Sequence, residues 1–189
     1  METKKIAVLG TGSWGTTFSQ VLADAGHTVV IWGRRPIIVE MINEHENSAY
    51  LPGVELSESI SATTDIKEAV EGAEVVVVAV PTAAIDPVMK EAAKFAPDAT
   101  YVSLSKGLDT ETLKSATEIM KDAGNLKDSQ VALVSGPNLS REIADRQPAA
   151  SVVASTDAET AKRLAIMFHN AYFRPYVSTD VIGCETAGA

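Results

Sequence analysis

The sequence predicts one doubly wound α/β domain with a mainly parallel sheet and extra strands toward its C-terminus. Apolar, β-branched segments alternate along all 189 residues with segments whose apolar residues recur at helical spacing. No linker or internal repeat interrupts this alternation. The segment 74–81 is apolar almost throughout, which is typical of a strand that helices cover on both faces. Strands joined by helices pair in parallel, so the pattern indicates a sheet with helices on each face.

The first strand, 5–9, runs into a glycine motif, and a helical pattern follows it. Residues 10–15 have the spacing G-x-G-x-x-G. In this order the first glycine permits a tight turn, the second lets the backbone approach a pyrophosphate, and the third lets the helix pack against the strand. The helix N-terminus offers free N–H groups to phosphates. We therefore expect a Rossmann-type dinucleotide site, the alternative being a glycine-rich turn without a ligand. Its expected cofactor contacts are Gly10, Gly12, Ser13, Trp14 and Gly15.

The second strand, 28–32, determines which cofactor we expect. Gly26 ends the first helix, and the strand leads into Gly33-Arg34-Arg35. NAD-specific sites usually have a carboxylate here for the ribose 2′-hydroxyl, whereas arginine binds a 2′-phosphate bidentately. Because no carboxylate stands at the strand end, we favour NADP (NADPH), with NAD as the second choice. The alternative is that Arg34 and Arg35 are solvated surface charges.

The stretch 36–81 is expected to complete the first half of the sheet. A helix follows Pro36 over 37–46, and the loop after it carries Tyr50. Short strand-like pieces are expected at 54–56 and 60–62, then a helix from a cap at Asp65 to Gly72. Pro81 ends the central strand 74–81 at its carboxyl end, where open parallel sheets bind ligands. We therefore expect Pro81 beside the cofactor.

The second half continues the alternation and supplies a lysine and a second turn. Strand 100–104 delivers Lys106 toward the same crevice, although an exposed lysine on a loop is the alternative. The turn 135–138 after strand 131–134 can offer backbone N–H groups. Further helices are expected at 85–95, 111–123 and 139–144, after a capping box at Thr156 and Glu159, and after a cap at 179–180. Further strands are expected at 150–154 and 172–177.

Composition argues against several classes of function. The net charge of −9 opposes general nucleic-acid binding. Cys184 is the only cysteine, so no intramolecular disulfide can form, and we expect it to pack. The three histidines are scattered, so no metal site is expected and surface or helix-end roles suffice. No leader or membrane-spanning run is evident, and a cytoplasmic protein without membrane partners is expected.

Seven collinear motifs carry a resemblance to a known family. They are GTGSWGT at 10–16, WGR at 32–34, YLPG at 50–53, AVPT at 79–82, SKG at 105–107, SGP at 135–137 and TDVIGCETAGA at 179–189. Together they cover essentially the whole chain. On these motifs the sequence resembles the bacterial-type NAD(P)-dependent sn-glycerol-3-phosphate dehydrogenases, in their N-terminal cofactor-binding domain.

The resemblance implies reversible hydride transfer between NAD(P)H and dihydroxyacetone phosphate, which makes sn-glycerol 3-phosphate for phospholipids. It also implies that Ser13, Trp14, Arg34, Arg35 and Tyr50 line the cofactor site, with Ser140 near it. Lys106 would touch cofactor and substrate, and Gly136 and Asn138 would contact the substrate. Two positions depart from the family: Asn138 stands where Ser or Thr is usual, and Ser140 where Ala is common.

In the family, a lysine that exchanges the proton follows the last motif almost at once, and then a helical substrate domain. Neither occurs in residues 1–189, so we expect this cofactor domain to hold no catalytic residue and to be inactive alone. An apolar face left uncovered would favour a homodimer. The alternative from another class is a stand-alone NAD(P)H-binding or sensing module. Dehydrogenases of 3-hydroxyacids or 6-phosphogluconate fit the SKG and YLPG motifs poorly.

Overall fold

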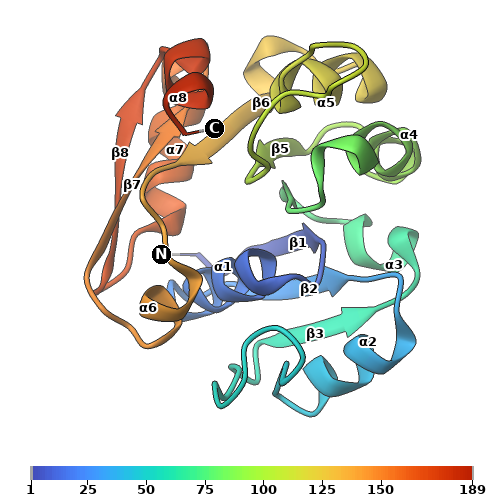
Figure 1. The fold of residues 1–189 in the computed structure, drawn as a ribbon, viewed down its shortest axis with the longest axis vertical. Helices are drawn as coiled ribbons and strands as arrows, with labels where there is room; N and C mark the ends of the chain where they lie inside the picture. Colours follow the sequence, from blue (N-terminus) through green and yellow to red (C-terminus); the bar gives the residue numbers. More distant parts are fainter. Residues whose placement is uncertain (1, 189) are drawn as a thin grey trace.

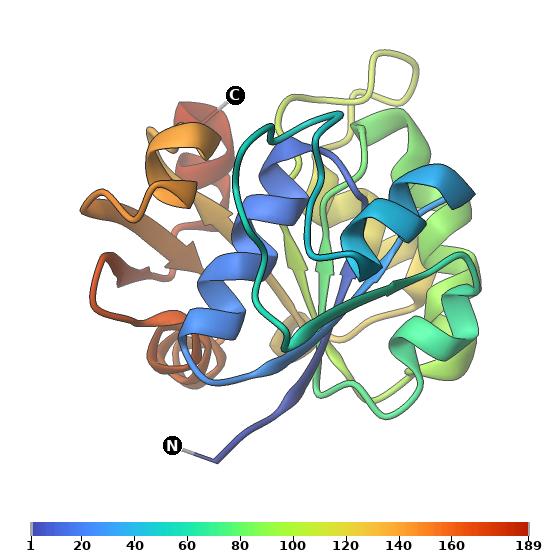
Figure 2. The same cartoon turned by 90° about the horizontal axis from the view of Figure 1, so that it is seen from below.

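The computed structural model describes residues 2–188 as one eight-stranded sheet with helices on both faces (Figures 1 and 2). The strands are β1 (Lys5–Leu9), β2 (Thr28–Trp32), β3 (Ile60–Thr63), β4 (Val75–Val78), β5 (Thr100–Ser103), β6 (Val131–Ser135), β7 (Ala149–Ala154) and β8 (Phe173–Ser178). The helices are α1 (Ser13–Asp24), α2 (Pro36–Asn43), α3 (Ile66–Val70), α4 (Ile85–Phe95), α5 (Ala116–Gly124), α6 (Ser140–Ala144), α7 (Ala158–Phe168) and α8 (Val181–Ala187). No helix in this described part is long and apolar enough to cross a bilayer.

The strand order is β3-β2-β1-β4-β5-β6-β7-β8. The first six strands in this order pair in parallel, β7 pairs antiparallel with β6, and β8 pairs in parallel with β7. The predicted doubly wound, mainly parallel sheet with extra C-terminal strands is therefore confirmed. The chain leaves β1 toward β2 on one side and returns to β4 on the other. This change of direction puts a crevice at the carboxyl ends of β1 and β4, where open sheets of this kind bind ligands.

Two apolar layers hold the helices on the sheet. Alternate strand residues face opposite sides, so Ile6 and Val8 belong to one layer whereas Ala7 and Leu9 belong to the other. Helices α1, α2 and α7 pack on the first face, and α3, α4 and α5 pack on the second. At the centre of the first layer is Phe18 of α1, whose ring lies 5.2 Å from that of Phe168 and 5.8 Å from that of Phe173. These contacts fix α1, and with it the glycine loop that precedes it.

Two predicted helix boundaries are wrong, and local capping explains both. Helix α2 ends at Asn43 instead of residue 46 because His45 takes a left-handed conformation, φ 62°, and Glu46 N donates to Met41 O at 3.0 Å. Helix α5 begins at Ala116 instead of 111. The Ser115 hydroxyl accepts from the Glu118 N–H, and the Glu118 carboxylate accepts from the Ser115 N–H.

Three smaller predictions also fail. The segment 54–56 forms no strand, because Leu56 N donates to His45 O at 2.8 Å and is used within the loop. The central strand β4 stops at Val78, three residues before Pro81. The capping box at Thr156 does not form. Asp157 is the N-cap of α7, and its N–H donates to the Ser155 hydroxyl at 3.3 Å, so the helix begins one residue later.

An asparagine occupies the outer edge of each terminal strand. At β3, the Ala62 N–H donates to Asn43 Oδ1 at 2.7 Å and the Ala62 carbonyl accepts from Asn43 Nδ2 at 3.0 Å. At β8, the Phe173 N–H donates to Asn170 Oδ1 at 2.8 Å and the Phe173 carbonyl accepts from the Asn170 N–H at 3.2 Å. Pro175, in the middle of β8, has no N–H to offer.

Candidate functional site

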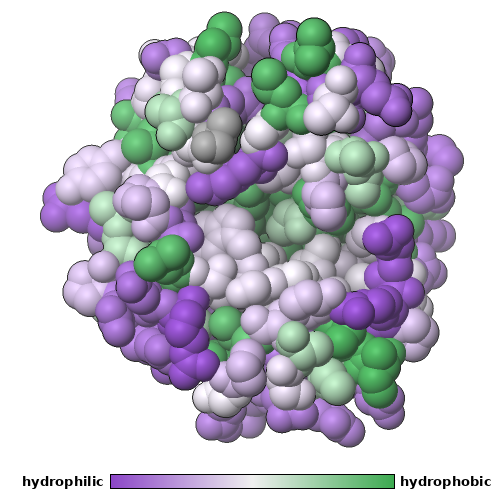
Figure 3. Space-filling model, in the orientation of Figure 1, coloured by the Kyte–Doolittle hydropathy of each residue, from purple (hydrophilic) through white to green (hydrophobic). Residues whose placement is uncertain are grey.

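Two adjoining hollows occupy the carboxyl ends of β1, β2 and β4. The first, which we call the loop hollow, has a volume of about 620 Å³, and the second, the apolar hollow, about 560 Å³. They share Trp32, Arg34, Val80 and Pro81, so they form one cleft across the point where the strand order reverses. Figure 3 shows this face hollowed near its centre and bordered by hydrophilic side chains. A cleft of this size and position suits a long ligand with distinct parts.

The glycine loop forms one wall of the loop hollow, and its three glycines meet different constraints. Gly10 has φ +130°, and a Cβ there would lie 2.4 Å from the Ala79 carbonyl oxygen. A Cβ on Gly15 would lie 2.4 Å from the Gly10 carbonyl oxygen. In contrast, a Cβ on Gly12 would meet no atom within 4 Å, because this residue borders open cleft at the N-terminus of α1. Gly10 and Gly15 thus serve close packing, whereas Gly12 leaves room for a ligand.

Trp14 belongs both to the core and to the cleft. Its ring lies 5.6 Å from that of Phe18, and the residue also lines the loop hollow. The indole therefore packs on α1 and also contributes to the wall of the cleft. The neighbouring Ser13 begins α1 but is not among the residues that line either hollow.

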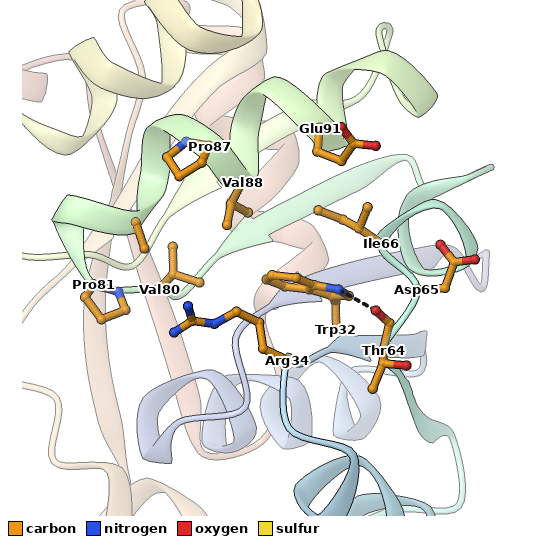
Figure 4. Close-up of a pocket in the computed structure, with 11 residues that line it drawn as sticks. Trp32, Arg34, Thr64, Asp65, Ile66, Val80, Pro81, Pro87, Val88 and Glu91 are labelled. Carbon is orange, nitrogen blue, oxygen red and sulfur yellow. Dashed lines mark hydrogen bonds between the residues drawn. The ribbon is translucent and has the colours of Figure 1, made fainter.

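The two arginines after β2 reach the cleft without a carboxylate partner among residues 2–188. Arg34 lines both hollows, and Figure 4 shows its guanidinium extending toward Val80 and Pro81. Arg35 lines the loop hollow with Tyr50, hydrogen-bonds to the Tyr50 hydroxyl, and lies 5.0 Å from the centre of its ring. Two cations without a carboxylate partner in the described residues therefore border the cleft at the end of β2. This placement agrees with binding of an anionic ligand.

The apolar hollow was not anticipated from the sequence. In Figure 4 the Trp32 ring faces Val88 and Ile66, and Asp65 and Glu91 stand at the rim. The Trp32 Nε1–H donates to the Thr64 carbonyl at 3.1 Å, which fixes the ring orientation. In the sequence these residues have ordinary strand and helix patterns, so nothing distinguishes them from core positions. Only the packing of α3 and α4 beside β2 brings them together.

The other predicted residues lie outside both hollows. Lys106 has an exposed side chain, and its carbonyl accepts from the Thr82 hydroxyl at 2.9 Å. Its neighbour Ser105 lines the loop hollow and donates to the Val80 carbonyl at 2.6 Å. The side chain of Asn138 accepts from the Ser151 hydroxyl at 2.9 Å, and Asn138 N donates to the Gly136 carbonyl at 2.8 Å.

The remaining site residue, Ser140, begins α6, and its carbonyl accepts from the Thr17 hydroxyl at 3.3 Å. The structure therefore brings together Gly10, Gly12, Trp14, Gly15, Arg34, Arg35, Tyr50 and Pro81. Five further predicted residues, at the loops after β5 and β6 and at the starts of α1 and α6, do not line either hollow, although Ser13 and Lys106 directly adjoin residues that do. The five are Ser13, Lys106, Gly136, Asn138 and Ser140.

Other reactive side chains have structural contacts. His27 is buried, so the expected surface role is wrong for its side chain, but Nε2 lies 2.9 Å from the carbonyl of Met167 in the last turn of α7, which is a helix-end role. Glu185 accepts from the Thr117 N–H at 3.0 Å and from its hydroxyl at 2.7 Å, which caps α5. Cys184 is half-buried. Within residues 2–188, no group of three or more His, Cys, Asp or Glu is placed to hold a metal ion.

Comparison with known proteins gives consistent results. A family model described as NAD-dependent glycerol-3-phosphate dehydrogenase N-terminus matches residues 5–161. Two curated relatives named glycerol-3-phosphate dehydrogenase (NAD(P)+) come from Thermobifida fusca and Streptomyces griseus. They are 50% and 47% identical to this chain, and each match covers 98% of this chain and 56% of the relative. The chain thus spans about half the length of the curated relatives it matches.

Solved structures show the same extent of likeness. A crystal structure of glycerol-3-phosphate dehydrogenase from Coxiella burnetii has a TM-score of 0.89 and 32% identity, covering 98% of this chain and 57% of that one. A structure of glycerol-3-phosphate dehydrogenase from Plasmodium falciparum has a TM-score of 0.89 and 25% identity, covering 99% and 56%. In each case nearly all of this chain matches little more than half of the other protein.

Proposed function

The chain belongs to the family of N-terminal domains of NAD-dependent glycerol-3-phosphate dehydrogenases, and from this premise we propose that its cleft binds a nicotinamide dinucleotide. One observation carries the proposal. A glycine loop at the N-terminus of α1 borders a cleft that also holds two arginines without carboxylate partners among residues 2–188. The free N–H groups of the helix start and the guanidinium charges together favour a ligand with several phosphates.

The residues present fit such a ligand part by part. The open space beside Gly12 admits a pyrophosphate to the backbone of the loop. The apolar hollow between Trp32, Ile66 and Val88 offers flat apolar surfaces to an adenine ring. Leu104 and Ser105, at the far end of the loop hollow, lie where the nicotinamide end of an extended dinucleotide would reach.

We propose NADPH as the preferred cofactor. Arg34 stands between the two hollows, where the adenosine ribose would lie if the adenine occupies one and the pyrophosphate the other. A guanidinium there attracts a 2′-phosphate, and the absence of a carboxylate at the end of β2 removes the usual partner of a free 2′-hydroxyl. NADH remains the second ligand, bound without this contact.

For the whole protein we propose reduction of dihydroxyacetone phosphate to sn-glycerol 3-phosphate. The reduced nicotinamide supplies the hydride when it is bound. The Lys106 ammonium would stabilise the negative charge that develops on the carbonyl oxygen, and the backbone at Gly136 with the Asn138 amide would hold the substrate. Since the relatives are nearly twice as long, we propose that proton transfer needs a group outside residues 1–189 and that this domain alone has no turnover. A homodimer stays a prediction.

Titration with NADPH and NADH, followed by the fluorescence of Trp14 and Trp32, tests this proposal. Arg34→Asp should raise the Kd for NADPH about tenfold or more and leave that for NADH within about threefold, because only NADPH carries the 2′-phosphate. Arg174→Asp is the matched control, since Arg174 changes the net charge equally but lies on β8 beside Tyr176. Equal losses for both cofactors would refute the 2′-phosphate site. Turnover of dihydroxyacetone phosphate would refute the proposal that the domain is inactive alone.

A further inference from the structure

Asn47 lies in the loop after α2 and is completely buried, although it is a polar residue outside the regular elements. Its side chain reaches the glycine loop 36 residues earlier in the sequence. Asn47 Nδ2 donates to the Thr11 carbonyl at 3.0 Å and to the Thr16 hydroxyl at 2.8 Å. The Thr16 hydroxyl also lies 3.3 Å from the same carbonyl. The Thr11 carbonyl is thus held from two sides, both within the protein.

The fixed carbonyl controls a group on the opposite side of the same peptide plane. No peptide bond in the described residues is cis, so the Thr11 carbonyl and the Gly12 N–H point in opposite directions. Because Asn47 and Thr16 hold the carbonyl, the Gly12 N–H points away from them, on a residue that borders the open cleft. We propose that Asn47 is a positioning residue that keeps the glycine loop in its phosphate-binding conformation. This inference rests on the proposed function.

Stability alone does not account for an asparagine at this position. Asn47 Oδ1 is buried and has no hydrogen-bond partner in the part of the chain that the structure describes. A buried oxygen without a partner costs free energy that an apolar side chain of similar volume would avoid. Such a replacement would lose the two hydrogen bonds that Asn47 Nδ2 donates, and both of these hold the glycine loop or the start of α1 behind it.

Asn47 also connects the loop to the opposite wall of the cleft. Its carbonyl accepts from the Tyr50 N–H at 3.1 Å and from the Leu51 N–H at 2.7 Å, which forms the turn that carries Tyr50. The Tyr50 hydroxyl in turn accepts a hydrogen bond from the Arg35 guanidinium. Asn47 therefore fixes the glycine loop through its side chain. Through its main chain it fixes the turn that carries Tyr50, which lines the loop hollow together with Arg35.

The test compares Asn47→Asp with Asn43→Asp, a matched control that also loses an amide donor but acts only on β3. Dissociation constants are measured for NADPH and ADP, which carry a pyrophosphate, and for adenosine 2′-phosphate, which does not. Asn47→Asp places a carboxylate oxygen against the Thr11 carbonyl. This change should raise the Kd for NADPH and for ADP about tenfold or more, and leave the Kd for adenosine 2′-phosphate within about twofold of its original value. Asn43→Asp should leave all three within about twofold.

Each other result decides the question. Unchanged affinities in Asn47→Asp, or equal losses for all three ligands, would overturn the positioning role. If Asn47→Asp does not fold, Thr16→Val removes the hydroxyl that Asn47 and the Thr11 carbonyl share. In Thr16→Val the Kd for NADPH and for ADP should rise about threefold, and that for adenosine 2′-phosphate should not rise. An equal change in all three dissociation constants would overturn the inference. If the unmodified chain binds none of the ligands, the proposed function itself fails.

Discussion

Two single-methyl substitutions in the glycine loop should separate ligand binding from folding. In Gly12→Ala the new Cβ meets no protein atom within 4 Å, and the backbone, at φ −70° and ψ 173°, is accessible to alanine. Alanine is a poorer N-cap than glycine, but it also reduces the entropy of the unfolded chain. These effects oppose each other, and we expect a net change in unfolding free energy within about 1 kcal/mol.

Binding should respond much more strongly to the same methyl group. The Cβ would enter the space through which the pyrophosphate approaches the loop backbone, so at least one hydrogen bond to a charged oxygen would lengthen or break. Such a bond contributes about 1.5–3 kcal/mol, which corresponds to a Kd for NADPH raised about 10- to 150-fold. Fluorescence titration measures this, and thermal denaturation of the same sample measures the stability.

Gly15→Ala is the reciprocal variant. Its Cβ would lie 2.4 Å from the Gly10 carbonyl oxygen and 3.1 Å from the Ala79 Cβ, so α1 must move away from β1. Overpacking of this kind costs about 1–3 kcal/mol, and a loss of about 2 kcal/mol lowers the melting temperature by roughly 4–8 °C in a domain of this size. An unchanged Kd for NADPH in Gly12→Ala would refute this prediction. A melting temperature of Gly15→Ala no lower than that of Gly12→Ala would refute it as well.

Burial raises the pKa of the Tyr101 phenol, because the buried ring favours the neutral form. The buried neutral phenol therefore contributes its full share to the free energy of unfolding below about pH 10, and this contribution is lost as the pH rises further. Tyr101→Phe should therefore weaken the fall in melting temperature as the pH rises from about 10 to about 11. A fall as steep as in the unmodified chain would contradict this. Glu185→Ala removes both bonds to Thr117 at the start of α5 and should cost about 1–2 kcal/mol in chemical denaturation. Glu159→Ala, on an exposed residue, should cost about 0.5 kcal/mol or less, and equal losses would show that the cap contributes nothing.

The sheet and the glycine loop could be predicted because their signals are local. Continuous apolar strands and the spacing of Gly10, Gly12 and Gly15 report geometry within a few residues, and the arginines follow directly from the end of β2. Helix ends were harder, because His45 takes a position where glycine is usual and gives no signal of its own. The start of α5 at Ser115 carried a capping-box pattern with Glu118 that could have been found.

The rest of the cleft depends on contacts between distant segments. Trp32, Ile66 and Val88 follow ordinary apolar patterns, and they form a hollow only because α3 and α4 pack beside β2. Asn47 reads as one polar residue in a polar loop, and its bonds to Thr11 and Thr16 cross more than 30 residues of sequence. No pattern within a short window contains that information.

The two asparagines at the outer strands limit how copies of this protein can associate. An open sheet edge is a template on which a further strand can add, and this is a common start of aggregation. Here Asn43 occupies the outward N–H and carbonyl of Ala62 on β3, and Asn170 occupies those of Phe173 on β8. Pro175 has no N–H, so β8 offers one donor fewer. A strand of a second copy would have to displace these side chains before pairing. Any dimer is therefore expected to form through side-chain surfaces, leaving the sheet at eight strands per copy.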